Sequence, residues 1–239
     1  MSVQVVALVL ESPVPGDLAG FWAHALGWGI RHSDDGAVEL VPTDATSFRI
    51  ACRPGAHAKV GQNVIHFDLT TTSLDHQNNT VADLVANGAR HINIGQSPDD
   101  THVVLADPDG NEFCVLAPFN NFLAGCPRLG AVNCDGTHAL GQFFAAALDW
   151  PLVWDQDEET AIQSPDATGP KITWSGPPLM PKSNRERFHF HLSSTPGANP
   201  QAALDRLDKL GATPIENIHH CPGATPMADV DGNAFCFVQ

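Results

Sequence analysis

The stretch THVVLADPDGNEFCVL at residues 101–116 returns in shorter form as TPMADVDGNAFCFV at residues 225–238. Two further pairs accompany it, ALGW (25–28) with ALDW (147–150) and IHFDL (65–69) with FHFHL (188–192). Trp28 and Trp150 are 122 residues apart, and His66 and His189 are 123 apart, so one duplication accounts for all three pairs. Solenoid repeats span only about 20–50 residues, so a unit of this length is a whole domain.

The chain of 239 residues is long enough for two domains that each bury a core. Asn, Gly and Pro residues interrupt both strand and helix periodicity between the two copies. The sequence therefore predicts a first domain at residues 1–119, a linker at 120–127 and a second domain at 128–239.

Composition excludes several kinds of partner. The chain has 12 basic and 27 acidic residues, a formal charge of −15 that repels nucleic acid. No stretch approaches the roughly 18 apolar residues of a membrane span, and the apolar start lacks the basic flank of an export signal. The six cysteines show no CxxC pair. We expect a cytoplasmic protein with reduced thiols.

Periodicity predicts the same order of elements in each copy. A β-rich run at 3–10 is followed by apolar residues at helical spacing. In the first copy these are Leu18, Phe21, Trp22, Ala25 and Leu26, and in the second they are Leu140, Phe143, Phe144, Ala147 and Leu148. Strand candidates at 37–41, 48–53 and 63–71 follow, then a helix that ends near Gly88 and a hairpin centred on 107–111. Each half therefore reads as strand–helix–strand–strand units repeated twice, an α+β fold.

This order, the aromatic first helix that ends in LGW, the strand that opens with histidine and the DPDGN turn together resemble the vicinal oxygen chelate superfamily. That superfamily includes glyoxalase I, bleomycin-resistance proteins and extradiol dioxygenases. The resemblance covers nearly the whole chain. It implies two glyoxalase-like domains in tandem, each with two βαβββ modules whose sheet forms an incompletely closed cup with helices outside. It also implies an internal pseudo-dimer and leaves a homodimer open.

Metal-dependent relatives carry ligands on the first and last strand of each module, which implies where a metal would lie here. The closing glutamate of the family pattern is replaced by Cys114 in the first copy and Cys236 in the second. The histidine of the opening strand falls on Val5 and Leu129. His66 matches a surviving ligand position, as does His189.

Strand alternation predicts which side chains share a cup. In the first domain the predicted cup residues are His66, Asp68, Glu112 and Cys114, with Arg49 as a clamp for a carboxylate. In the second domain they are His189, His191 and Cys236. The alternative is that both cysteines are small buried hydrophobes and that neighbouring strands satisfy the histidines. The tract His219–His220–Cys221 is interpreted as part of a loop and not as a metal site, because consecutive residues of an extended chain point to opposite sides.

Two functions remain open, and no catalytic residue is assigned. The favoured one is a binding protein that holds a small organic molecule in a cup without the usual metal. The other is a metal-dependent lyase, isomerase or dioxygenase with rearranged ligands, His66 together with Asp68, Glu112 or Cys114. A divalent Zn, Fe, Mn or Ni ion bound by His66, Glu112 or His189 would fit that second function. A further hypothesis gives the fused pair only one working cup, the one with Glu112, Asp68 and Arg49.

Overall fold

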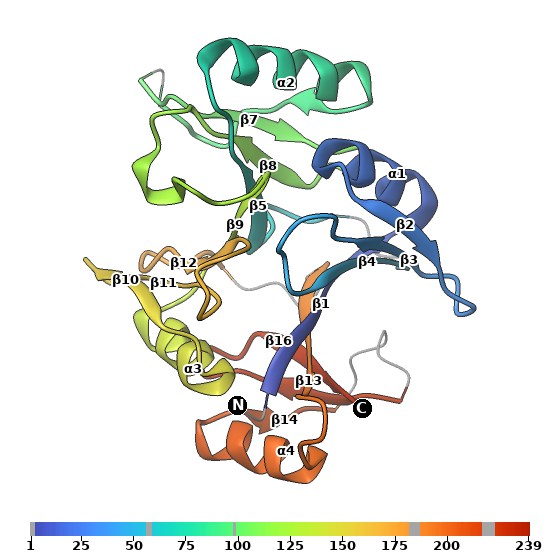
Figure 1. Ribbon diagram of the computed structural model, residues 1–239, viewed down its shortest axis with the longest axis vertical. Helices are drawn as coiled ribbons and strands as arrows, with labels where there is room; N and C mark the ends of the chain where they lie inside the picture. Colours follow the sequence, from blue (N-terminus) through green and yellow to red (C-terminus); the bar gives the residue numbers. More distant parts are fainter. Residues whose placement is uncertain (1–2, 56–58, 98, 182–186, 217–222) are drawn as a thin grey trace.

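The computed structural model describes residues 3–55, 59–97, 99–181, 187–216 and 223–239, which form two mixed sheets flanked by helices (Figure 1). Sheet A contains, in spatial order, β14 (Thr213–Pro214), β15 (Thr225–Ala228), β16 (Ala234–Val238), β13 (Phe188–Ser194), β1 (Val3–Ser12), β4 (Arg49–Pro54), β3 (Val38–Val41) and β2 (Gly29–His32). Sheet B contains β10 (Leu152–Gln156), β11 (Glu159–Ile162), β12 (Lys171–Trp174), β9 (Leu129–Cys134), β5 (Ile65–Leu69), β8 (Glu112–Val115), β7 (Val103–Ala106) and β6 (Arg90–His91). The helices are α1 (Pro15–Leu26), α2 (Leu74–Ala86), α3 (His138–Leu148) and α4 (Pro200–Lys209), with a short 3₁₀ helix η1 (Asn121–Leu123).

Each sheet combines strands from both sequence repeats. In sheet A, β1 of the first repeat pairs antiparallel with β13 of the second, the blue and orange strands at the centre of Figure 1. In sheet B, β5 pairs antiparallel with β9 in the same way. The predicted α+β tandem fold is confirmed, but each sheet is shared by the two repeats, whereas the resemblance implied a cup formed within each repeat.

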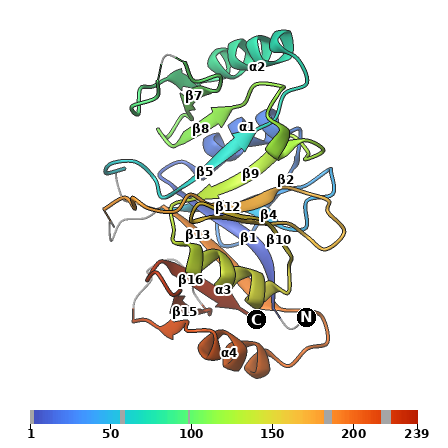
Figure 2. The same cartoon turned by 90° about the vertical axis from the view of Figure 1, so that its left-hand side faces the viewer.

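The predicted helical stripes form the core. All five apolar residues predicted on each first helix are buried in α1 and α3. Trp22 of α1 packs edge-on against Phe67 and Phe113 of sheet B, with ring centroids 4.8 and 5.0 Å apart. Phe144 of α3 stacks on Trp174 at 5.2 Å. Helices α2 and α4 lie at opposite ends of the molecule (Figure 2).

The repeated turn has the predicted hairpin form in both copies. Asp107 accepts hydrogen bonds from the backbone N–H groups of Asp109 and Asn111, at 3.0 and 2.9 Å. Asp229 organises the second turn in the same way. Gly110 has a φ of +87°, in the left-handed region that favours glycine. These turns bring the closing strands beside the histidine strands β5 and β13.

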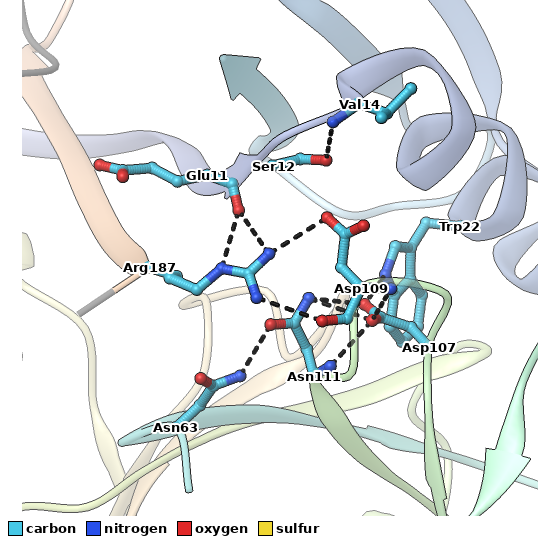
Figure 3. A network of polar contacts seen from close by, with 9 residues as sticks. All are labelled: Glu11, Ser12, Val14, Trp22, Asn63, Asp107, Asp109, Asn111 and Arg187. Carbon is cyan, nitrogen blue, oxygen red and sulfur yellow. Dashed lines mark hydrogen bonds and ion pairs between the residues drawn. The ribbon is translucent and has the colours of Figure 1, made fainter. Parts of the chain in front are cut away.

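A buried arginine ties the two sheets together (Figure 3). Arg187, directly before β13, donates from Nε and Nη2 to the backbone oxygen of Glu11 at 3.1 and 3.0 Å. Its Nη1 and Nη2 reach the backbone oxygen and the carboxylate of Asp109, at 3.2 and 3.1 Å. Asp109 lies in the hairpin of sheet B, so Arg187 links that hairpin to sheet A.

Among the described helices, none has the length and apolar character needed to cross a membrane.

Candidate functional site

The faces of the two sheets turned away from the helices are here called cup A and cup B. In sheet B, Phe67 and Leu69 belong to the core, as alternation predicts. His66, Asp68 and Cys114 lie on the opposite face, with donor atoms within 4.8 Å of one another. The predicted grouping of these three residues is confirmed for cup B.

The charges in cup B are coupled. His66 Nε2 lies 3.5 Å from Asp68 Oδ1. Burial lowers the pKa of His66, but the hydrogen bond and charge of Asp68 and the charge of Glu112 raise it, and the net pKa is above its usual value. Burial, followed by the charge of Asp68, raises the pKa of the Cys114 thiol. Without a metal, the imidazole and the thiol therefore favour their protonated forms.

Glu112 is engaged elsewhere. Its Oε1 forms an ion pair with Lys59 Nζ, and its Oε2 accepts from the Asn63 N–H at 3.3 Å. Glu112 therefore lies beside the donor trio of cup B, not within it.

Cup A holds the second predicted group, because His189, His191 and Cys236 also bring their donor atoms within 4.8 Å of one another. Cys236 is disulfide-bonded, which corrects the expectation of a reduced thiol. A sulfur in a disulfide does not offer a thiolate to a metal. The tract His219–His220–Cys221 lies outside the described residues.

The assignment of Arg49 to the cup of His66 is wrong. Arg49 lies on β4 in sheet A, where Ala7 of β1 pairs with both Arg49 and His191. Burial and the charges of Arg53 and Arg49 lower the pKa of His191 to about 4. Arg49 Nε contacts Glu39 Oε1 at 2.8 Å. The prediction failed because alternation gives the face of a strand but not the sheet that it joins.

The opening-strand positions also need correction. Val5 and Leu129, where the family histidine was expected, both pack into the helix-side core. A register shift in each strand, between Val5 and Ala7 and between Leu129 and Ala131, changes the face that they present. Ala131 and Asn133 occupy the cup side of β9, since they pair with Asp68 and His66.

A cavity of about 340 Å³ opens on cup B. Its lining residues are Asp68, Leu116, Asn120, Phe122, Leu123, Asn133, Trp154, Glu159, Thr160, Thr173, Trp174 and Ser175. The predicted linker forms one wall, because Phe122 packs edge-on against Trp154 with centroids 5.6 Å apart. Lys171 Nζ lies 4.2 Å above the Phe122 ring and bonds the Phe122 backbone oxygen. A linker was expected here, and it is part of the site.

Sequence reasoning missed Asn133 and Thr173. Both are polar, both line the cavity, and they are direct partners on β9 and β12. Their signal was available as polar residues inside the short apolar runs LGAVNC and KITW. The register shift in β9 interrupts the alternation of the first run, and the second run has only 4 residues, so neither gave a cup assignment.

The donor set of cup B fits a borderline-soft divalent ion such as zinc, since it offers imidazole, carboxylate and thiol groups. His66, Asp68 and Cys114 would hold the ion, and its binding would release the protons of the Cys114 thiol and the His66 imidazolium. All three come from the neighbouring strands β5 and β8. The opposite wall at Ala131 supplies no ligand group.

Solved structures share this fold. Glyoxalase I from Zea mays superimposes with a TM-score of 0.69 at 13% identity, over 100% of this chain and 92% of that one. A proposed dioxygenase from Bacillus subtilis gives 0.60 at 12% identity, over 98% and 84%. No curated protein sequence matches the chain. The profile of the glyoxalase-like domain matches residues 7–116 and again 131–238, so the chain belongs to the glyoxalase-like domain family, with two copies in tandem.

Proposed function

We propose that this protein binds a small organic molecule in the cavity of cup B, without the usual metal of the superfamily. The observation that carries the proposal is the cavity itself. Its volume of about 340 Å³ is within the usual range of ligand pockets, roughly 300–1,000 Å³. It combines aromatic walls with a few hydrogen-bonding groups, the composition that such pockets have.

Trp154 supports the proposal. A tryptophan side chain that is 37% exposed on the outer strand β10 leaves apolar area in water. Its contact with Phe122 holds the indole at the cavity wall. An aromatic or apolar ligand would cover that surface.

Cup A is a weaker candidate. Its residues Ala7, Val9 and Ala51 form a buried aliphatic cluster. Arg49 contacts Glu39, and Cys236 is disulfide-bonded. We therefore assign ligand binding to cup B and a structural role to cup A. This assignment keeps the hypothesis that only one cup binds a ligand. Arg49, however, belongs to cup A and not to the binding cup.

A library of small aromatic and aliphatic compounds, screened by two-dimensional NMR on the whole chain, tests this function. Compounds should shift the amide signals of cavity residues, and Trp154→Ala should weaken their binding at least fivefold. Val153→Ala is the matched control, since Val153 is similarly exposed on the same strand but does not line the cavity. A screen without any cavity binder would refute the proposal.

The donor trio of cup B favours a second candidate, a metal-dependent lyase, isomerase or dioxygenase. A metal bound there would act as a Lewis acid on ligand oxygens. Asp68 would orient His66, and Asn133 would position a substrate from the facing strand. Metal content, treated in the Discussion, separates this candidate from the first.

The domain boundaries 1–119, 120–127 and 128–239 and the cytoplasmic location remain proposals. The disulfide at Cys236 weighs against a strongly reducing compartment.

A further inference from the structure

The duplication provides an internal comparison of the two cups. In cup B, Asn133 pairs with His66 on one side and with Thr173 on the other. In cup A, Val9 pairs in the same way with His189 and with Ala51. The two cups therefore have the same framework, but only cup B has an amide and a hydroxyl at these two positions.

Thr173 has an unused hydroxyl. The residue is only 7% exposed, and its Oγ1 has no hydrogen-bond partner among the described residues. Leaving a buried hydroxyl unpaired costs about 1–3 kcal/mol, so such a group in a cavity wall indicates a missing partner. Asn133 also lines the cavity, and its carboxamide makes no hydrogen bond within the described part of the chain. Both groups are available to a ligand.

The same row of the sheet continues to Trp154. Thr173 pairs with Ala161, and Ala161 pairs with Trp154. Neighbouring strands are about 4.8 Å apart, so roughly 10 Å separates the hydroxyl strand from the indole strand. Ala161 itself is fully buried, and the cavity beside this row is bounded by the aromatic side chains of Trp154 and Phe122. An aromatic ring of one or two cycles fits that span.

The charges of the lining exclude one class of ligand. Asp68 and Glu159 are the ionisable residues that line the cavity, and both are acidic. The basic groups on this face have other partners, since Lys171 contacts the oxygen and ring of Phe122 and His66 lies 3.5 Å from Asp68. A carboxylate ligand would thus meet two acidic side chains, and the described residues that line the cavity include no Lys, Arg or His to pair with it.

Building on the ligand-binding function above, we propose that cup B recognises a planar aromatic amide. The ligand amide pairs with the Asn133 carboxamide and reaches the Thr173 hydroxyl, while its ring lies in the cavity against Trp154 and Phe122. Amide groups on both sides have matched donors and acceptors, and a carboxylate of the same shape does not.

Nicotinamide and nicotinate are a matched pair of probes, because they share ring and size and differ only in amide against carboxylate. Each is titrated into the intact protein and followed by the NMR signals of Asn133, Thr173 and Trp154. Nicotinamide should bind at least tenfold more tightly than nicotinate. Equal affinity, or tighter binding of nicotinate, overturns the proposal and leaves cavity binding itself intact.

Variants at Thr173 test the hydroxyl. Thr173→Val keeps the shape and breaks no hydrogen bond within the described residues, so its melting temperature should not fall. It should weaken nicotinamide about fivefold or more, and Thr173→Ser should retain the affinity. Unchanged binding by Thr173→Val overturns the role of the hydroxyl.

The library screen separates the two levels of inference. Cavity binders that are not aromatic amides, with no shift from nicotinamide, overturn the amide specificity alone. Absence of any cavity binder overturns both the specificity and the binding function.

Discussion

Arg187 Nη2 lies 3.1 Å from Asp109 Oδ2, and this contact joins the second repeat to the closing hairpin of the first. Arg187 is 4% exposed and donates to three oxygens in all, so its removal leaves buried acceptors without partners. We expect Arg187→Ala to lower the free energy of unfolding by about 3 kcal/mol. Chemical denaturation measures the change.

Arg31→Ala provides the control for Arg187→Ala, since Arg31 pairs with Glu39 while its own side chain is 60% exposed. It should cost less than about 1 kcal/mol. Equal effects of the two substitutions would mean that the link between the sheets contributes little.

The carboxyl of Asp107 should make stability depend on pH. Burial raises its pKa to about 6, although hydrogen bonds from Asn111 and Trp22 lower it in part. Between about pH 4 and pH 6 the folded state keeps a proton that the unfolded state has lost, so this contribution falls as pH rises through that window. The stability difference between wild type and Asp107→Asn should shrink by roughly 2 kcal/mol from pH 4 to pH 7.

Asp166→Asn is the control for this pH dependence. Hydrogen bonds from Ser164 and Thr168 lower the pKa of Asp166, so any contribution has the opposite sign and is lost as pH falls. Denaturation of wild type and both variants across this pH range measures the slopes. A parallel slope for wild type and Asp107→Asn would contradict the assignment.

Two helical glycines should respond in opposite ways to alanine. A Cβ on Gly141 of α3 would lie 1.9 Å from Thr160 Oγ1, whereas one on Gly20 of α1 would meet no atom within 4 Å. Gly141→Ala should destabilise the protein by about 1–3 kcal/mol through overpacking. Gly20→Ala should stabilise it by about 0.5–1 kcal/mol. Thermal unfolding of the two variants measures both effects. Stabilisation by Gly141→Ala would show that β11 shifts away from the added methyl group at little cost.

Metal content tests the choice between the two functions. We expect the purified, untagged protein to carry well below one metal ion per chain, because the facing strand β9 offers Ala131 and Asn133 to cup B instead of a strong ligand. Elemental analysis of wild type, His66→Ala and His189→Ala measures it. One Zn, Fe, Mn or Ni ion that disappears with His66→Ala would favour the metal-dependent enzyme.

Cys236 should resist alkylation until a reductant is added. Cys114, its counterpart in cup B, is a free thiol and should react once the chain is unfolded. Peptide mass spectrometry after labelling with and without reductant distinguishes them. Labelling of Cys236 in the unfolded, unreduced chain would show that the disulfide is absent.

The sequence predicted the fold well because the duplication fixes the order of elements and alternation fixes their faces. His66 with Asp68 and Cys114, and His189 with His191 and Cys236, were placed together correctly. Register shifts in β1 and β9 defeated the prediction at Val5 and Leu129, since one extra residue turns the rest of a strand over.

Pairing between distant strands was not predictable in the same way. Which sheet a strand joins depends on packing of the whole chain, and this decided the place of Arg49. The wall made by Phe122 depends on how the linker folds back onto Trp154, a contact with no local signal.

The sharing of each sheet by the two repeats has a consequence for how the two halves of the chain stay together. A molecule that fills the cavity would touch Asp68 from the first repeat and Thr173 from the second. Such a ligand would resist separation of the two halves. A bound ligand should therefore slow proteolysis between the two repeats. Once the chain is cut, the ligand should keep the two fragments associated.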